Sequence, residues 1–261
     1  MMLRRAFLIG LLILLAACGS TDRAIPVGEP VAPNFRDADP VDFTSPTPAR
    51  FPVHGIDAAR FQTNIDWAQA RRNGVNFAFI KATEGGDLLD PAFDTHWRGA
   101  GSAGVARGAY HFYYFCTSPE VQASWFIANV PKSKGMLPPV LDMEWNAFSP
   151  TCAHRRPDAR TVQDEMRRWL RIVERHYGQR PIIYTTPGFY EDADLGSFKD
   201  YEYWLRTTAK TPREAFPRQT WRFWQYSATG LIDGISGEVD LNAFSGSRRE
   251  WTAWLATRRL R

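Results

Sequence analysis

Two carboxylates stand at the end of a short apolar stretch near the middle of the chain. Asp142 and Glu144 lie two residues apart within Pro138–Trp145, where two prolines and a run of apolar residues predict a short buried strand. Side chains two residues apart on a strand point to the same face, roughly 6.5–7 Å from each other. Two neighbouring acids are costly to bury unless one keeps a proton and the other its charge, and glycoside hydrolysis needs such a pair. A solvated turn or an ion pair is the alternative interpretation of the same residues.

Strand and helix patterns alternate from residue 53 onward, and these elements must position the pair. The expected elements are strands over 53–57, 76–82, 107–115, 138–145 and 180–185, helices over 64–72, 92–104, 119–129 and 158–177, short strands over 203–205, 223–226 and 239–241, and a closing helix over 248–260. About five strand–helix units followed by three strands predict an α/β fold of the TIM-like barrel type.

In barrels of parallel strands, the functional side chains lie at the carboxyl ends of the strands. Acidic, aromatic and polar residues recur at this position of the predicted barrel. They are Asp57, Glu84, Tyr110, His111, Asp142, Glu144, Tyr184, Gln225, Tyr226 and Asp240. The sequence therefore predicts that acids far apart along the chain meet at one rim.

The composition is that of a globular domain. The chain has 261 residues, of which 44% are hydrophobic, enough for one large core. Ten tryptophans and nine tyrosines fit a cleft that packs against sugar rings, although an aromatic-rich core explains any single one equally well. The net charge is +4, and +2 over residues 18–261 once Arg4 and Arg5 are removed, so nothing suggests a nucleic-acid partner. No set of His, Cys or Asp has metal-ligand spacing, and no cofactor is expected.

Residues 1–17 have the pattern of a signal peptide. Arg4 and Arg5 precede an apolar run shorter than a membrane span. Leu15–Cys18 resembles the lipobox of bacterial lipoproteins, which implies removal of the leader and lipidation of Cys18; a plain secretory signal is the alternative. Because Gly19 is not Asp, the resemblance favours the outer membrane, facing the periplasm, with secretion as the other possible location.

A segment rich in Pro, Asp, Ser, Thr and Ala follows this leader. Residues 18–50 hold few large apolar side chains, so we expect a flexible tether there and a catalytic domain over 51–261.

Seven segments in this order resemble the family 25 glycoside hydrolases, the Chalaropsis-type lysozymes. The resemblance covers Val53 to about Phe244. It is specific because all seven segments occur in the same order as in the family. The segments are Gly55-Ile56-Asp57 with Gln62 and Ile65-Asp66-Trp67; Phe79-Ile80-Lys81-Ala82-Thr83-Glu84-Gly85; Gly108-Ala109-Tyr110-His111-Phe112; Leu141-Asp142-Met143-Glu144; Ile183-Tyr184-Thr185; Phe223-Trp224-Gln225-Tyr226-Ser227; and Gly237-Glu238-Val239-Asp240-Leu241-Asn242.

The resemblance implies an irregular barrel that hydrolyses the β-1,4 bond between N-acetylmuramic acid and N-acetylglucosamine in peptidoglycan. Glu144 matches the general acid of the family, and Asp142, Asp57 and Asp240 match its other active-site carboxylates. Asp142 is expected to stay charged and to stabilise positive charge, either on the sugar ring or on a substrate acetamide that acts as nucleophile. One position departs from the family pattern, because Ala59 stands where a serine is frequent.

Further candidates surround these acids. Glu84, Tyr110, Tyr184, Trp224 and Gln225 are expected to bind substrate; core packing for the aromatic residues and an ion pair for Glu84 are the alternatives. His54 and His111 are expected to be structural. Cys116 and Cys152 form an even pair on loops at the predicted rim, and we expect a disulfide between them in an oxidising compartment.

Other functions remain open at this point. An inactive peptidoglycan-binding module, or a hydrolase of another N-acetylglucosamine polymer, would use the same aromatic residues. Four acids at one rim argue against a binding module, because binding alone does not need Asp142 beside Glu144. A monomer with peptidoglycan strands as its partner is expected, and the sequence does not identify an inhibitor.

Overall fold

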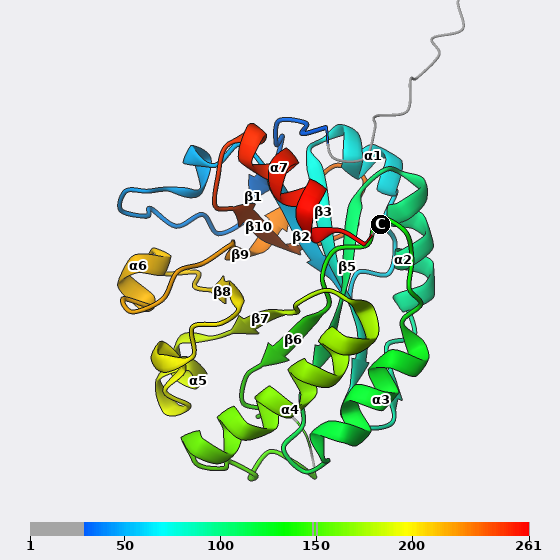
Figure 1. The fold of residues 1–261 in the computed structure, drawn as a ribbon. Helices are drawn as coiled ribbons and strands as arrows, with labels where there is room; N and C mark the ends of the chain where they lie inside the picture. The colour runs from blue at the N-terminus through cyan, green and yellow to red at the C-terminus, as the bar shows by residue number, and fades with distance from the viewer. Residues whose placement is uncertain (1–28, 148, 150, 261) are drawn as a thin grey trace, which may run out of the picture.

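The computed structural model describes residues 29–147, 149 and 151–260 (Figure 1). The predicted leader and Cys18 therefore lie outside the described residues. The strands are β1 (Arg36–Asp37), β2 (His54–Ala58), β3 (Val75–Glu84), β4 (Leu88–Leu89), β5 (Ala106–Phe112), β6 (Val140–Met143), β7 (Ile182–Thr185), β8 (Glu202–Arg206), β9 (Phe223–Leu231) and β10 (Val239–Phe244). The α-helices are α1 (Trp67–Arg72), α2 (Phe93–Ser102), α3 (Pro119–Asn129), α4 (Ala159–Tyr177), α5 (Pro187–Asp192), α6 (Pro212–Ala215) and α7 (Arg248–Arg258).

Eight strands close into a barrel, which confirms the predicted fold class. The hydrogen-bonded order is β9-β10-β2-β3-β5-β6-β7-β8, and β8 pairs with β9 to complete the ring. The strands β2, β3, β5, β6, β7, β8 and β9 are each parallel to the next in this order. Strand β10 lies between β9 and β2 and is antiparallel to both. Helices α1 to α5 follow β2, β3, β5, β6 and β7, so five strand–helix units precede the last three strands. Figure 1 shows α2, α3 and α4 packed along one side of the barrel.

The longest helix, α4, illustrates why these residues fold locally as they do. Asp158 caps its first turn by accepting a hydrogen bond from the Thr161 amide at 2.8 Å, and Gly178 ends it in the left-handed conformation at φ 68°. Its buried residues recur at spacings of three and four, which places them on the face that covers the sheet. They are Val162, Met166, Trp169, Leu170, Val173 and Tyr177.

Strand alternation divides the core into two layers. The barrel interior is filled by aromatic residues such as Phe77, Phe79 and Phe223, and a second, larger layer lies between the strands and the helices. Both layers come from the same strands, since neighbouring residues point to opposite faces. No helix among the described residues is long and apolar enough to cross a membrane.

Residues 29–50 are packed on the barrel, and this part of the chain is not the flexible tether that its composition suggested. Strand β1 pairs with β9, and the Val31 amide donates a hydrogen bond to Asn76 Oδ1 at 2.7 Å. The Phe35 and Phe43 rings pack against the outer core layer, and Phe43 meets Trp224 edge-on with centroids 4.9 Å apart. The two phenylalanines cover apolar surface that the barrel already provides, so burial of their rings adds to these hydrogen bonds in holding the segment.

A substitution at Phe43 tests whether this segment belongs to the folded unit. Phe43→Ala should lower the free energy of unfolding by about 1–2 kcal/mol, because a half-buried ring and its aromatic pair are lost. Urea unfolding followed by tryptophan fluorescence measures this change. Phe61→Ala is the matched control, since that ring is 72% exposed. Equal stability of wild type and Phe43→Ala would show that the segment contributes nothing to the fold.

Candidate active site

Four carboxylates meet in one cavity at the carboxyl ends of the strands. Asp57, Asp142, Glu144 and Asp240 all line this cavity, which has a volume of about 430 Å³. Its other lining residues are Ala58, Ala59, Phe61, Gln62, Lys81, Tyr110, Phe112, Tyr184, Trp204, Arg206 and Gln225. We call it the acidic cleft.

The strand register explains why these acids converge. Asp57 on β2 stands directly opposite Asp240 on the antiparallel strand β10, so their side chains share a face and their Cβ atoms lie about 5 Å apart. Asp142 on β6 is paired with Tyr184 on β7, which places both on the same side of the parallel sheet. Glu144 follows the end of β6 by one residue and reaches the cleft from the rim.

A chain of amide and hydroxyl hydrogen bonds holds Asp57. Gln225 Nε2 donates to both carboxyl oxygens of Asp57, at 2.9 and 3.1 Å, and Asn242 Nδ2 donates to Oδ1 at 2.7 Å. Each amide is oriented in turn by a third residue, since the Tyr184 hydroxyl donates to Gln225 Oε1 at 2.9 Å and Trp204 Nε1 donates to Asn242 Oδ1 at 2.7 Å. Asp57 is therefore fixed in position before any substrate arrives.

The two acids of the β2–β10 pair favour sharing a proton. Burial raises the pKa of Asp57 well above its ordinary range, and the charge of Asp240 raises it further, against the hydrogen bonds from Asn242 and Gln225. Burial also raises the pKa of Asp240, although the hydrogen bond with Asp57 and the charge of Arg206 oppose this. We infer that Asp57 holds the proton and Asp240 accepts its hydrogen bond.

Burial also raises the pKa values of Asp142 and Glu144, the two acids with which the sequence analysis began. It raises the pKa of Glu144, while Arg206 and Lys81 act in the opposite direction. It raises the pKa of Asp142 well above its usual value, and the neighbouring Glu144 adds to this while Lys81 opposes it. Burial therefore favours the neutral form of Asp142 in the free cleft, and the charge expected on this residue stays a prediction.

Seven of the nine predicted site residues line the acidic cleft. They are Asp57, Tyr110, Asp142, Glu144, Tyr184, Gln225 and Asp240. Glu84 does not line it and instead forms an ion pair with Lys81. Trp224 does not line it either, because neighbouring residues of β9 alternate between faces: Gln225 points into the barrel while Trp224 lies in the outer core layer and donates to the Thr207 carbonyl at 2.8 Å.

The cleft contains residues for which the sequence analysis gave no role. Lys81 and Arg206 provide positive charge among the acids, and Trp204 provides an aromatic wall. The two-residue period of strand β8 could have predicted Trp204 and Arg206, because it places both side chains on the inner face of the barrel. Phe61, Gln62 and Phe112 line the cleft as well.

The two predicted structural histidines lie away from the cleft. His54 is hydrogen-bonded to the Tyr226 hydroxyl at 2.9 Å and to the Phe51 carbonyl at 2.7 Å. His111 is bonded to Thr83 and Gln122. Burial lowers the pKa of each histidine to about 4, so both are neutral at physiological pH. No group of three or more His, Cys, Asp or Glu residues within the described ranges is arranged to hold a metal ion.

The predicted disulfide is present. Cys116 and Cys152 are joined, with their Cα atoms 5.7 Å apart, and the bond connects the loop after β5 to the loop after β6. The second of these loops begins with Glu144. The disulfide therefore restrains the rim next to the cleft.

Removing this disulfide should destabilise the domain. A bond that spans 36 residues of sequence restricts the unfolded chain by about 4 kcal/mol, so Cys116→Ser with Cys152→Ser should lower the unfolding free energy by up to that amount. Urea unfolding with and without reductant measures the loss in the wild type and in the double variant. Reductant should leave the double variant unchanged, and a wild type that is equally insensitive would contradict the prediction.

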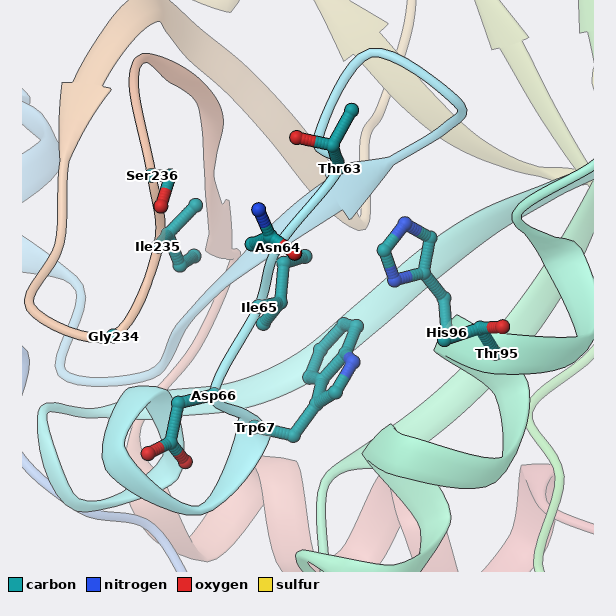
Figure 2. Close-up of a pocket in the computed structure, with 10 residues that line it drawn as sticks. All are labelled: Thr63, Asn64, Ile65, Asp66, Trp67, Thr95, His96, Gly234, Ile235 and Ser236. Atoms are coloured by element: carbon teal, nitrogen blue, oxygen red, sulfur yellow. The ribbon is translucent and has the colours of Figure 1, made fainter.

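A second cavity lies behind the loop that lines the acidic cleft. Figure 2 shows Trp67 and His96 side by side, with Thr63, Asn64 and Ile65 across from them. The two rings meet edge-on with centroids 5.8 Å apart, and burial lowers the pKa of His96. The remaining lining residues are Asp66, Thr95, Gly234, Ile235 and Ser236.

A closed barrel with paired acids in a cleft at the carboxyl ends of its strands is the construction of a barrel glycoside hydrolase. The model of the glycosyl hydrolases family 25 matches residues 56–235, and the chain belongs to this family.

Several known proteins resemble the chain over most of its length. Uncharacterized protein YegX of Escherichia coli K12 is 39% identical over 213 residues, covering 80% of this chain and 75% of that protein. Lysozyme M1 of Streptomyces globisporus is 37% identical over 210 residues, covering 75% of this chain and 68% of the relative. The solved structure of a family 25 glycosyl hydrolase from Bacillus anthracis superposes with a TM-score of 0.70 at 34% identity, covering 78% of this chain and 94% of that one. The protein is therefore a glycoside hydrolase.

Proposed function

We propose that this protein is a lysozyme that cleaves the β-1,4 bond between N-acetylmuramic acid and N-acetylglucosamine in peptidoglycan. The observation that carries the proposal is the convergence of four carboxylates from β2, β6 and β10 on one cleft. Membership of family 25, and similarity to Lysozyme M1 and to the N,O-diacetylmuramidase of Chalaropsis, support peptidoglycan as the polymer.

Glu144 acts as the general acid in this proposal. Its carboxyl lies at the rim, where a leaving oxygen can reach it, and burial raises its pKa so that it carries a proton nearer neutral pH. Arg206 and Lys81 limit this rise, which lets Glu144 release the proton once the bond begins to break.

Asp142 stabilises the positive charge that develops on the substrate. Its Oδ1 is buried and lacks a hydrogen-bond partner within the described part of the chain, so it can accept a bond from the N–H of a bound acetamide. That bond and the charge of Lys81 both favour the ionised form, and Asp142 then supports the acetamide oxygen as it attacks the anomeric carbon. In this proposal, substrate binding favours the charged form of Asp142 that the sequence analysis expected.

Asp57 and Asp240 position the reacting groups. Gln225 and Asn242 hold Asp57 through three hydrogen bonds, and the shared proton keeps this pair close to a single negative charge. Such a pair can orient the attacking water that opens the intermediate. Tyr110, Tyr184 and Trp204 provide the apolar walls against which sugar rings pack.

We also propose that the enzyme works in the bacterial cell envelope as a monomer. Lipidation of Cys18 and attachment to the outer membrane would place it beside peptidoglycan, and secretion is the other outcome. Mass analysis of the mature N-terminus decides between them, because a lipidated cysteine adds acyl chains to residue 18 and a secretory signal leaves none.

Fragment analysis tests the proposed bond. Purified sacculi digested by the full chain should yield muropeptides with N-acetylmuramic acid at the reducing end, as read by mass spectrometry after borohydride reduction. Chitin digested in parallel should yield little. N-acetylglucosamine at the reducing ends, or faster cleavage of chitin, would contradict the proposed specificity.

A further inference from the structure

A cationic pocket lies at the mouth of the barrel opposite the acidic cleft. It has a volume of about 510 Å³ and is lined by Arg107 at the start of β5, by Lys134 and Gly135 in the loop before β6, and by Arg259 just after α7. The loop and the end of the chain are joined by two backbone bonds, from Gly135 N to Leu260 O at 2.7 Å and from Leu260 N to Met136 O at 2.8 Å. The pocket is therefore a fixed part of the fold.

Arg107 is built into this pocket. Its guanidinium stacks on Trp97 with Cζ 4.6 Å from the ring centroid, and it lies so close to Gly101 that any Cβ at that position would clash with it. The side chain is half-buried, and its Nε is fully buried without a hydrogen-bond partner among the residues that the structure describes. Burial lowers the pKa of Arg107, which is the effect of an uncompensated charge.

No side-chain carboxylate among the described residues lines the pocket where the three cations gather. None of the ion pairs in the described part of the chain includes Arg107, Lys134 or Arg259. A half-buried arginine without a counter-ion keeps donors available for an anion, and arginine prefers phosphate or carboxylate oxygens. Lys134 and Arg259 are exposed at the rim, so they can reach an anion that projects from a surface.

The start of the described chain lies at the same mouth. Val31 is hydrogen-bonded to Asn76 at the beginning of β3, and β3 is the parallel neighbour of β5, with Ala78 opposite Arg107. Residues 29–31 therefore lie on the side of the barrel that holds the cationic pocket, and the acidic cleft opens on the other side. A membrane at this mouth would leave the cleft directed away from it.

We propose that this pocket binds the phosphate of an anionic phospholipid headgroup and so seats the barrel on a membrane with its cleft facing outward. Arg107 binds the phosphate oxygens at the base of the pocket, and Lys134 and Arg259 attract the negative surface around it. The proposal rests on the pocket and on the course of residues 29–31, and it stands apart from the bond that the cleft cleaves.

Vesicle binding and phosphate binding together test the proposal. The full chain is sedimented with phosphatidylcholine vesicles and with vesicles containing about one-third phosphatidylglycerol, and the arginine Nε–H NMR signals are followed during a titration with inorganic phosphate at constant ionic strength. We expect a saturable shift of the Arg107 signal and tighter binding to the anionic vesicles. Lys134→Ala with Arg259→Gln should reduce that preference about 20-fold, since each cation near an anionic surface contributes about fivefold.

The matched control removes the same charge at the other mouth. Arg160→Gln with Lys210→Ala alters exposed cations that follow β6 and β8 at their carboxyl ends, and it should change vesicle binding less than twofold. All variants share one N-terminus, so any membrane affinity of that end cancels, and unchanged hydrolysis of soluble muropeptides shows that each variant is folded. Equal losses in the two double variants would overturn the proposal, as would an unshifted Arg107 signal. A shift with phosphate but no preference for anionic vesicles would leave a free-phosphate site and overturn the lipid assignment.

Discussion

Replacing Glu144 by glutamine should reduce kcat for peptidoglycan by about 1,000-fold and leave the fold unchanged. Glutamine keeps the size and the hydrogen-bonding capacity of the side chain but has no proton to give to the leaving oxygen, and general acid catalysis usually contributes 10²- to 10⁴-fold. The measurement is the initial rate of reducing-end release from purified sacculi, with the melting temperature of each protein recorded alongside.

Glu191→Gln is the matched control for this variant. Glu191 is exposed on α5 at the same mouth of the barrel and undergoes the same chemical change, so its rate should stay within about twofold of the wild type. A Glu144→Gln variant that still cleaves at near the wild-type rate would remove Glu144 from the role of general acid, and the acid would then have to be sought among the other three carboxylates.

The pH dependence of kcat gives an independent view of the same residue. Burial raises the pKa of Glu144, and a general acid is active only while protonated, so the alkaline limb of the profile should lie above the ordinary pKa of glutamic acid. In Arg206→Gln this limb should move further upward, because Arg206 favours the ionised form of Glu144. An alkaline limb that does not move would show that Arg206 does not act on the acid.

The sequence was sufficient to predict the barrel and all four acids, because both depend on short-range patterns. A carboxylate at the carboxyl end of an apolar strand is visible in the chain itself, as Asp57 and Asp142 were. The pairing of Asp57 with Asp240 depends on long-range strand order and not on a short-range pattern. It arises because β10 inserts antiparallel between β9 and β2, and sequence spacing contains no record of which strands become neighbours.

The errors follow from properties that a linear pattern does not determine. Trp224 and Trp204 both lie on short strands rich in aromatic residues, and only the register decides that the first faces the helices and the second the cleft. The segment 29–50 looked unable to form a core, and it does not form one; it adds Phe35 and Phe43 to a core made by other residues.

Replacing Asp142 by asparagine should reduce kcat by two to three orders of magnitude and should also stabilise the protein above neutral pH. Activity falls because the neutral amide cannot offset positive charge on the substrate, and preorganised electrostatic groups of this kind contribute about 10²- to 10³-fold. Stability rises because burial lifts the pKa of the wild-type carboxyl above its unfolded value. The contribution of such a group to stability is complete below the unfolded pKa, about 3.9, and is lost as pH rises through the folded pKa.

Two measurements together distinguish this electrostatic role from damage to the fold. The unfolding free energy of Asp142→Asn minus that of the wild type should be most positive at alkaline pH. It should shrink as pH falls and be smallest below the unfolded pKa of about 3.9, where the wild-type carboxyl is protonated in both states. Asp164→Asn, an exposed change on α4, should show no such trend. Loss of activity with loss of stability would indicate a packing role for Asp142, and full activity would show that the charge is not needed. Loss of activity together with a gain in stability at high pH is the combination that only a buried, charge-stabilising carboxylate produces.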